Sequence, residues 1–344
     1  MESIFFEEIT NKNDKNSNEK NNIIDSFIQI NENKEEKFIL LEDDKILNSL
    51  TEEEWKKIIK SHKNLSELPK EKISLIINSL ENGINSNLRE SIWKLLSKSE
   101  NLKLNHKKNY YFQLLKTTNI EIENKIKKDL ERTFISNNSN KLNKNSLFNI
   151  LKAYSIYDKE ISYSQGTNFI IYVLLNVVKN EEDSFWLFVS IMIEKKWRLN
   201  FIKNNKFIII LLNKFLQNLQ INFPLIYNHF EKINFIDSIP GIFSQFYLTI
   251  LSYENIPIEF SIRIFDLFWI FSDEIITNSL INMLNLTKNE IFKMEKDELY
   301  IFIKNNFIKN CIEKFGIDYC IDKKNMTNTK NKFLTEKEII FNFK

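Results

Sequence analysis

The amino-acid sequence predicts an all-α protein, and three observations point to that class. Apolar residues recur three and four positions apart over most of the chain, whereas the alternation of a half-buried strand is absent over any useful length. Only 4 Gly and 4 Pro occur in 344 residues, too few for the many turns of a β-sandwich. Hydrophobic residues form 43% of the chain and include 29 Phe, enough for one large multi-helix core.

Composition divides the chain into three parts. Residues 1–45 contain Asn-Lys-Asp tracts that bury too little apolar surface to offset the entropy of ordering, so this polar segment is predicted to be disordered. Residues 46–320 carry the helical pattern without a fixed-period repeat, which favours one continuous domain over a solenoid. Residues 321–344 are expected to form a polar tail, in which residues 334–343 could be a short docking helix.

The expected helices follow one another closely along the domain. Thr51 is predicted to cap the first helix, with Glu54 completing a capping box. Apolar spacing then indicates a helix through Leu75–Leu80 that ends near Gly83, and another over Asn87–Leu96. The remaining apolar segments predict helices at residues 109–117, 120–134, 147–157, 167–179, 182–194, 206–218, 222–230, 240–252, 257–271, 274–286 and 296–313.

Charge, cysteine content and missing motifs exclude several classes of function. The 48 Lys+Arg and 46 Asp+Glu are mixed along the chain, so we expect no nucleic-acid partner. The sequence has no Gly-rich phosphate loop, no His-Glu-x-x-His and no glycine-flanked serine elbow, so the chain should not bind nucleotide through a P-loop of its own. Cys311 and Cys320 lack the spacing of a zinc site and fit free thiols in a reducing compartment.

The N-terminus and the hydropathy pattern predict a soluble, cytoplasmic protein. Acidic residues such as Glu7 and Glu8 stand where a signal peptide needs bases, and no long apolar core follows them. The longest apolar stretch, residues 169–178, is interrupted by Asn176. It falls far short of the about 20 residues that span a bilayer, so no membrane span is expected.

The first candidate segment for chemistry runs from Ile126 to Phe134. At about 100° per residue, Ile126, Leu130 and Phe134 cluster on one side of a helix, and Arg132 falls roughly opposite them. The apolar stripe would hold the helix while Arg132 projects into solvent or toward a partner. Taken alone, Arg132 is an ordinary surface arginine.

The second candidate segment runs from Ile161 to Phe169 and precedes an apolar helix. Gly166 permits a tight or crowded backbone beside Gln165, whose side-chain amide can then reach outward from the loop or the first helical turn. Taken alone, this is a helix-start turn in which Gln165 merely caps.

Together, the two segments resemble the signature motifs of the TBC (Tre-2/Bub2/Cdc16) domain, the GTPase-activating domain for Rab proteins. The family pattern Ile-x-x-Asp-x-x-Arg is met by Ile126, Asp129 and Arg132, and the pattern Tyr-x-Gln by Tyr163 and Gln165. The two motifs stand in the family's order, and the resemblance covers roughly residues 46–310. The other resembling blocks are Gly83-Ile84, Leu88-Arg89, Trp93, Ala153-Tyr154, Tyr157-Asp158, Glu182-Asp183-Ser184-Phe185-Trp186, Ser244-Gln245-Phe246 and Arg263-Ile264-Phe265-Asp266.

The sequence also departs from the family pattern, although no departure touches Arg132 or Gln165. Asn85 stands where the family prefers Pro, and Ser162 and Ser272 stand where Gly is common. Phe246 and Phe265 replace the usual Trp, which keeps an aromatic ring in the core and should largely preserve packing.

The resemblance implies a mechanism with two catalytic fingers. Arg132 would stabilise charge on the transferring phosphoryl group, because its guanidinium is a permanent cation with a planar fork of donors. Gln165 would orient the attacking water, because an amide can donate and accept at once. The partner would be a GTP-bound Rab-type small GTPase that carries GTP and Mg²⁺, so the chain needs no cofactor of its own and could sit at endomembranes through this partner.

Six residues are expected to support the two fingers. Asp129 could orient Arg132 or pair with Arg89. Tyr163 is expected to hold the loop that carries Gln165, called the glutamine loop below. Thr133 and Asn168 could hold the loops by side-chain to backbone hydrogen bonds, with Gly166 allowing the turn. Two alternatives stay open: a catalytically silent TBC-like module that binds a GTPase or acts as a scaffold, and a helical scaffold with no GTPase partner.

Overall fold

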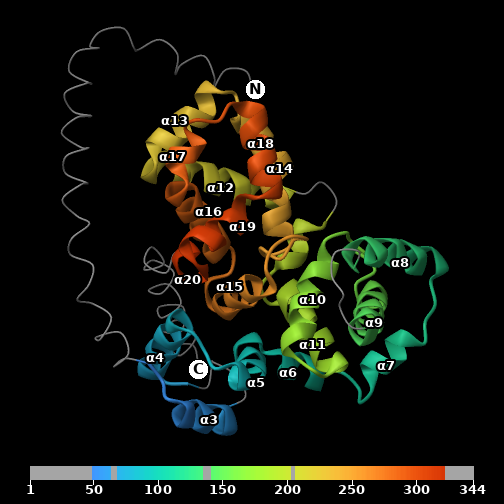
Figure 1. Cartoon of the computed structure of the whole chain (residues 1–344). Helices are drawn as coiled ribbons and strands as arrows, with labels where there is room; N and C mark the ends of the chain where they lie inside the picture. The colour runs from blue at the N-terminus through green and yellow to red at the C-terminus, as the bar shows by residue number, and fades with distance from the viewer. Residues whose placement is uncertain (1–48, 63–67, 135–140, 203–205, 322–344) are drawn as a thin grey trace, which may run out of the picture. The chain divides into compact units, whose positions relative to one another are not determined.

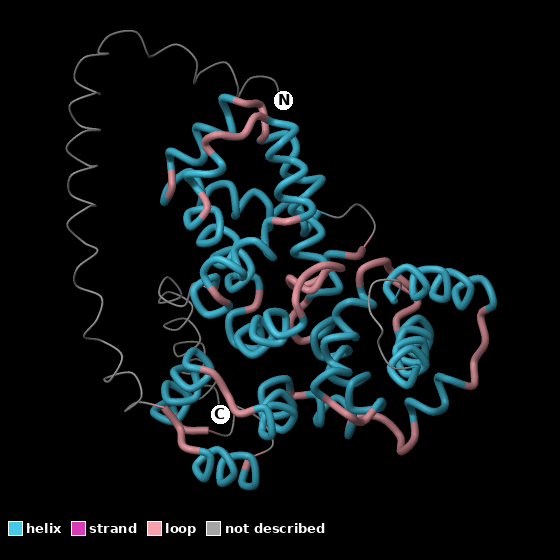
Figure 2. Tube along the Cα trace, in the orientation of Figure 1, coloured by secondary structure: helices cyan, strands magenta, loops and turns pink. Residues whose placement is uncertain are grey.

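The computed structural model describes residues 49–62, 68–134, 141–202 and 206–321, and within these ranges every regular element is a helix (Figure 2). The prediction of an all-α protein is therefore confirmed. The description does not extend to the side chains of residues 70–71, 132–134 and 141–143. The helices are α3 (Glu52–Ser61), α4 (Lys70–Asn82), α5 (Ser86–Ser97), α6 (Ser99–Leu104), α7 (Tyr110–Leu115), α8 (Ile120–Phe134), α9 (Lys141–Tyr157), α10 (Thr167–Val177), α11 (Glu181–Ile193), η3 (Trp197–Asn200), α12 (Lys206–Asn222), α13 (Pro224–Lys232), η4 (Ile236–Ser238), α14 (Ile239–Leu248), α15 (Ile258–Phe271), α16 (Asp273–Leu286), α17 (Lys288–Ile291), α18 (Lys296–Asn305), α19 (Phe307–Phe315) and α20 (Ile317–Cys320) (Figure 1).

The predicted boundaries of the first helices are confirmed by their capping groups. Thr51 Oγ1 accepts a hydrogen bond from Glu54 N at 3.3 Å, and Thr51 N donates to Glu54 Oε2 at 2.8 Å. This reciprocal pair is the capping box that starts α3. The helix α4 ends at Asn82, and Gly83 follows with a φ of 103°, a conformation that glycine adopts without steric cost.

Among the helix predictions that differ from the structure, two fail where the chain bends and neither Gly nor Pro marks a break. The expected single helix over 296–313 is wrong: α18 and α19 are separated at Asn306, whose φ of −127° is not helical. The short helix α6 was not expected, and it begins after Lys98, which adopts a left-handed φ of 60°. The helices beside these bends pack on different partners, α18 on α14, α19 on α16 and α6 on α11, and periodicity alone could not locate the bends.

Two central helices are buried on all sides, and they organise the core. The residues from Ser184 to Met192 on α11 are all buried, and α11 contacts α5, α6, α9, α10 and η3. The helix α15 is nearly as apolar and contacts α4, α5, α10 and α16. A helix that is hydrophobic around its whole circumference must lie inside the domain, which is where both are found.

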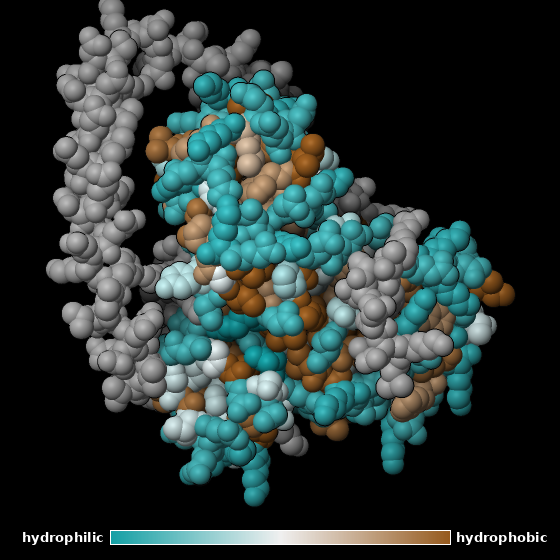
Figure 3. Space-filling view, viewed as in Figure 1, coloured by the Kyte–Doolittle hydropathy of each residue, from teal (hydrophilic) through white to brown (hydrophobic). Residues whose placement is uncertain are grey.

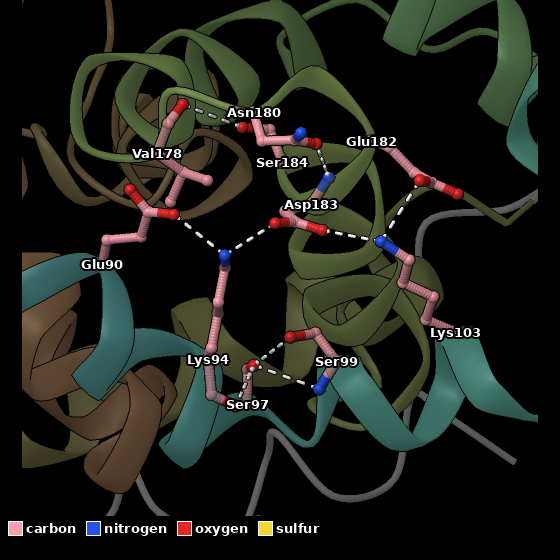
Figure 4. Close-up of polar contacts among 10 residues, drawn as sticks. All are labelled: Glu90, Lys94, Ser97, Ser99, Lys103, Val178, Asn180, Glu182, Asp183 and Ser184. Atoms are coloured by element: carbon pink, nitrogen blue, oxygen red, sulfur yellow. Dashed lines mark hydrogen bonds and ion pairs between the residues drawn. The ribbon is translucent and has the colours of Figure 1, made fainter. Parts of the chain in front are cut away.

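Asp183, at the start of α11, joins the helices α5, α6 and α11 (Figure 4). Lys94 Nζ of α5 donates to Asp183 Oδ2 at 2.6 Å, and Lys103 Nζ of α6 donates to Asp183 Oδ1 at 2.9 Å. Burial by itself would raise the pKa of Asp183, but the hydrogen bonds and charges of the two lysines hold it below its ordinary value. The network fixes α5 and α6 against α11.

A second buried polar cluster joins the beginning and the end of the domain. Arg89 Nε donates to Asp266 Oδ1 at 3.0 Å, and Trp93 Nε1 donates to the same oxygen at 2.8 Å. Arg89 Nη2 also donates to Ile84 O at 3.1 Å. Asp266 is completely buried on α15, so these donors satisfy a carboxylate that would otherwise be costly to bury.

The described residues from Ser49 onward belong to one compact unit. The predicted segment 1–45 and residues 322–344 of the predicted tail 321–344 lie outside the described residues, so the domain boundaries stay predictions. Across the described ranges, every helix is too short or too polar to pass through a lipid bilayer. Hydrophilic residues cover most of the surface seen in Figure 3, with hydrophobic ones showing between them. Cys311 and Cys320 are buried free thiols.

Candidate functional site

The first motif lies on α8, which is held against α9 by its apolar face. Ile126 and Leu130 are buried there, as the helical spacing predicts. At the same interface, Lys152 Nζ of α9 and Glu123 Oε1 of α8 form a largely buried ion pair at 3.1 Å. These contacts fix the orientation of α8 and leave Asp129 half-buried at its side.

The second motif lies on the loop between α9 and α10, and the buried carboxylate of Asp158 anchors this loop. Arg198 donates to both of its oxygens, from Nε at 3.1 Å and from Nη2 at 3.2 Å. Tyr154 Oη donates to Oδ2 at 3.1 Å. Burial alone would raise the pKa of Asp158, but the hydrogen bonds and charge of Arg198 lower it. The carboxylate therefore stays ionised and ties the start of the loop to η3.

A single hydrogen bond connects the two motifs. Tyr163 Oη donates to Asp129 Oδ2 at 2.6 Å, a short distance typical of a hydroxyl bound to a carboxylate. Burial raises the pKa of the Tyr163 hydroxyl, and the bond to the negative carboxylate raises it further. The phenol therefore remains a proton donor, and it draws the glutamine loop toward α8.

The loop turns sharply beside Gln165 because of its neighbours. Gly166 has a φ of 97°, in the left-handed region that side chains disfavour, and its N–H donates to Asn168 Oδ1 at 3.1 Å. Thr167 Oγ1 donates to Ser164 O at 2.7 Å. A Cβ added to Gly166 would lie 3.5 Å from Thr249 Cγ2, so α10 begins in close contact with the end of α14. Gln165 itself is exposed.

Residues from both motifs line one pocket of about 330 Å³. Gln165 and Asp129 contribute an amide and a carboxylate to it, so two segments that are 36 residues apart in the sequence meet at one place. The described lining consists of Asp129, Gln165, Gly166, Asn168, Phe169, Gln245, Leu248, Thr249, Tyr253 and Glu254.

The side chains of two predicted site residues, Arg132 and Thr133, lie outside the described part of the chain. Arg132 lies on α8 almost one turn after Asp129. The alternative that Asp129 pairs with Arg89 is wrong, because Arg89 binds Asp266 and Ile84 O. Arg89 thus joins α5 to α15, and it is not part of the pocket's described lining.

Sequence reasoning missed four residues that build the site. Arg198 anchors the glutamine loop, and no motif marked it. Tyr253 and Glu254 line the pocket, and the Tyr253 ring packs on Phe169 with 5.1 Å between centroids. Gln245 also lines the pocket, and its buried Nε2 has no hydrogen-bond partner among the described residues. Gln245 belongs to the block Ser244-Gln245-Phe246, which resembles the TBC family pattern, and this resemblance was the one indication of its role in the sequence.

Comparison with known proteins assigns the region that contains this site. Residues 86–292, which include both motifs, match the family model of the Rab-GTPase-TBC domain. The chain is 30% identical over 225 residues to the GTPase-activating protein GYP5 of Saccharomyces cerevisiae. The aligned region covers 65% of this chain and 24% of that protein. The chain is 28% identical over 247 residues to the human ecotropic viral integration site 5 protein homolog, covering 71% of this chain and 29% of that protein. The chain thus spans less than a third of the length of these curated relatives.

Two solved structures have the same fold. The TBC domain of a Chlamydomonas flagellar RabGAP superposes with a TM-score of 0.66 at 21% identity, covering 77% of this chain and 87% of that one. The Ypt/Rab-GAP domain of Gyp1p superposes with a TM-score of 0.61 at 18% identity, covering 86% of this chain and 98% of that one. The TBC-like fold expected from the resemblance is therefore confirmed.

Proposed function

Because the chain belongs to the Rab-GTPase-TBC domain family, we propose that it accelerates GTP hydrolysis by a GTP-bound small GTPase of the Rab type. The observation that carries the proposal is the hydrogen bond from Tyr163 to Asp129, together with the pocket that Asp129 and Gln165 share. This arrangement brings the loop that carries Gln165 close to α8, the helix that carries Arg132. Two groups that act on one phosphate must lie close together.

Gln165 supplies the water-positioning group. Its exposed amide can accept a hydrogen bond from the attacking water and donate one to the γ-phosphate. The left-handed Gly166 and the bond from Gly166 N to Asn168 Oδ1 restrain the backbone on one side of it. A restrained backbone lowers the entropy that Gln165 loses on reaching the partner's nucleotide.

Arg132 supplies the positive charge that stabilises the transition state. Its place on α8, three residues after Asp129, puts it at the end of the helix that Ile126 and Leu130 fasten to α9. A guanidinium donated in trans stabilises the negative charge on the equatorial oxygens of the transferring phosphoryl group. Asp129 orients this region through its bond to Tyr163.

The nucleotide and its metal come from the partner. GTP and Mg²⁺ are carried by the GTPase, and the chain contributes side chains to the transition state without a cofactor of its own. We place this activity in the cytoplasm, with the chain at endomembranes through its GTP-bound partner, in vesicle trafficking.

Single-turnover GTP hydrolysis across a panel of Rab proteins tests the proposal. Each GTPase is loaded with GTP and mixed with the full chain, and phosphate release is compared with the intrinsic rate. At least one Rab should hydrolyse GTP on the order of 10³-fold or more faster in the presence of the chain. Absence of acceleration with every member of the panel contradicts the proposal.

The competing function is a silent module that binds a GTPase without catalysis. It predicts that a GTP-loaded Rab binds the chain but keeps its intrinsic hydrolysis rate. Binding measured by calorimetry on the same panel therefore separates the two functions, and acceleration by the parent chain excludes the silent module.

A further inference from the structure

A second feature lies outside the pocket, in a stretch of the chain with unusual charge. Residues 101–120 contain four lysines and no acidic residue, although the whole chain has 46 Asp+Glu. The stretch includes the end of α6, all of α7 and the first residue of α8. Its local charge is therefore positive in a molecule whose overall charge is almost balanced.

The inner side of this stretch is firmly packed. On α7, Tyr111 and Leu114 are buried, and Tyr111 Oη donates to Glu181 Oε1 at 2.6 Å. His106 packs against Tyr110 and Trp186, with 4.6 Å and 4.9 Å between ring centroids. The outer side chains of the stretch are thus presented by a fixed backbone.

Phe112 lies on α7, and Lys108 and Lys116 lie just before and just after this helix; we call these three residues the lysine–phenylalanine patch. Together with Asn109 and Gln113, these residues line one hollow in the surface. Half of Phe112 is exposed, at 50%, and both lysines are exposed. Neither lysine forms an ion pair with a described residue, whereas Lys103 nearby is neutralised by Glu182 and Asp183.

We propose that the lysine–phenylalanine patch binds the surface of a membrane that contains anionic lipids. Phe112 would enter the boundary between headgroups and acyl chains, where an aromatic ring is favoured. Lys108 and Lys116 lie four residues to either side, and their long stems let the ammonium groups reach headgroup phosphates. The binding is peripheral and is the chain's own, separate from any attachment through a GTPase.

The combination of groups favours a membrane over other anionic partners. A membrane offers both an anionic surface for the lysines and an apolar layer for Phe112. Two further apolar side chains of the same stretch, Leu104 and Ile120, are 68% and 76% exposed. Exposed apolar residues within a basic stretch are typical of interfacial segments.

Vesicle sedimentation with the full chain tests the proposal. The parent should bind vesicles of phosphatidylcholine mixed with phosphatidylserine and should not bind pure phosphatidylcholine. Replacing Lys108→Ala or Lys116→Ala should weaken binding about fivefold for each lysine removed, and Phe112→Ala should weaken it by a similar factor. The double variant Lys232→Ala with Lys293→Ala, at exposed lysines elsewhere, and Ile209→Ala, which is 53% exposed, serve as matched controls that should bind like the parent.

A fluorescence measurement locates the contact at Phe112. All five native tryptophans are at most 4% exposed, so brominated lipids should quench their emission little. In the Phe112→Trp variant, the added indole should be strongly quenched by brominated anionic vesicles. Three results overturn the proposal: no binding by the parent, an equal loss of binding in the control variants, or loss in the lysine variants without quenching at position 112. The last of these would show a contact through the lysines alone, with position 112 outside the apolar layer.

Discussion

Tyr163 Oη and Asp129 Oδ2 lie 2.6 Å apart, and their hydrogen bond joins the two motifs across 34 residues of chain. The bond sets where the glutamine loop lies relative to α8, so it should affect catalysis through position.

Removing this hydroxyl should slow catalysis more than it weakens the fold. In Tyr163→Phe the Asp129 carboxylate loses a donor, and the glutamine loop is no longer drawn to α8. We expect the single-turnover rate to fall about tenfold or more, since a hydrogen bond to a charged group contributes about 1.5–3 kcal/mol. The exposed Tyr319→Phe is the control and should keep the parent rate. If Tyr163→Phe lowers only the melting temperature, the bond stabilises the fold without positioning Gln165.

Gly166 should resist substitution because of its backbone conformation. Its φ of 97° disfavours any side chain, while the space for a Cβ is sufficient, with Thr249 Cγ2 at 3.5 Å. Gly166→Ala should therefore cost about 1–2 kcal/mol in unfolding free energy and also misplace Gln165. Gly241→Ala is the matched control: Gly241 lies within α14 with nothing within 4 Å of an added Cβ, so alanine should be neutral or stabilising there. Equal effects of the two substitutions on urea unfolding would refute this explanation.

The pair formed by Arg198 and Asp158 should give stability a specific pH dependence. The folded pKa of Asp158 is lowered, so its contribution is fully present above the unfolded pKa of about 3.9 and is lost as the pH falls through the lower folded value. Arg198→Gln leaves the buried carboxylate without its cation. We expect a loss of about 2 kcal/mol at neutral pH that shrinks in acid, where the variant can protonate Asp158.

Urea unfolding from pH 7 to pH 3 measures this difference. The control is Lys125→Gln, which breaks an exposed ion pair with Glu121 and should change stability by less than about 0.5 kcal/mol at every pH. A deficit in Arg198→Gln that stays constant over the whole range would show that the ion pair is not its source.

Local sequence patterns could predict most helices, because apolar spacing and caps act within a few residues. Thr51 and Glu54 start α3 as expected, and the predicted range 120–134 coincides with α8. The break at Asn306 and the start of α6 at Lys98 depend on non-helical backbone conformations at residues that are neither Gly nor Pro. No local pattern marks such conformations.

The site could be predicted only in part, for the same reason. The motifs identified Asp129, Tyr163 and Gln165, which the structure brings together. The pairing of Arg89 with Asp266 spans 177 residues, and the clamp of Arg198 on Asp158 spans 40. Interactions over such separations follow from the folded topology, so sequence spacing could not show which carboxylate each arginine binds.

The most direct test of the two-finger mechanism is single-turnover GTP hydrolysis by the responsive Rab with substituted fingers. Arg132→Ala should lose on the order of 10³-fold in rate, and Arg132→Lys should lose most of it, because a point charge cannot replace the planar fork. Gln165→Ala should lose about 10²-fold or more. Lys125→Ala, an exposed lysine on the same helix, should keep the parent rate. Full acceleration in both Arg132→Ala and Gln165→Ala would contradict the mechanism.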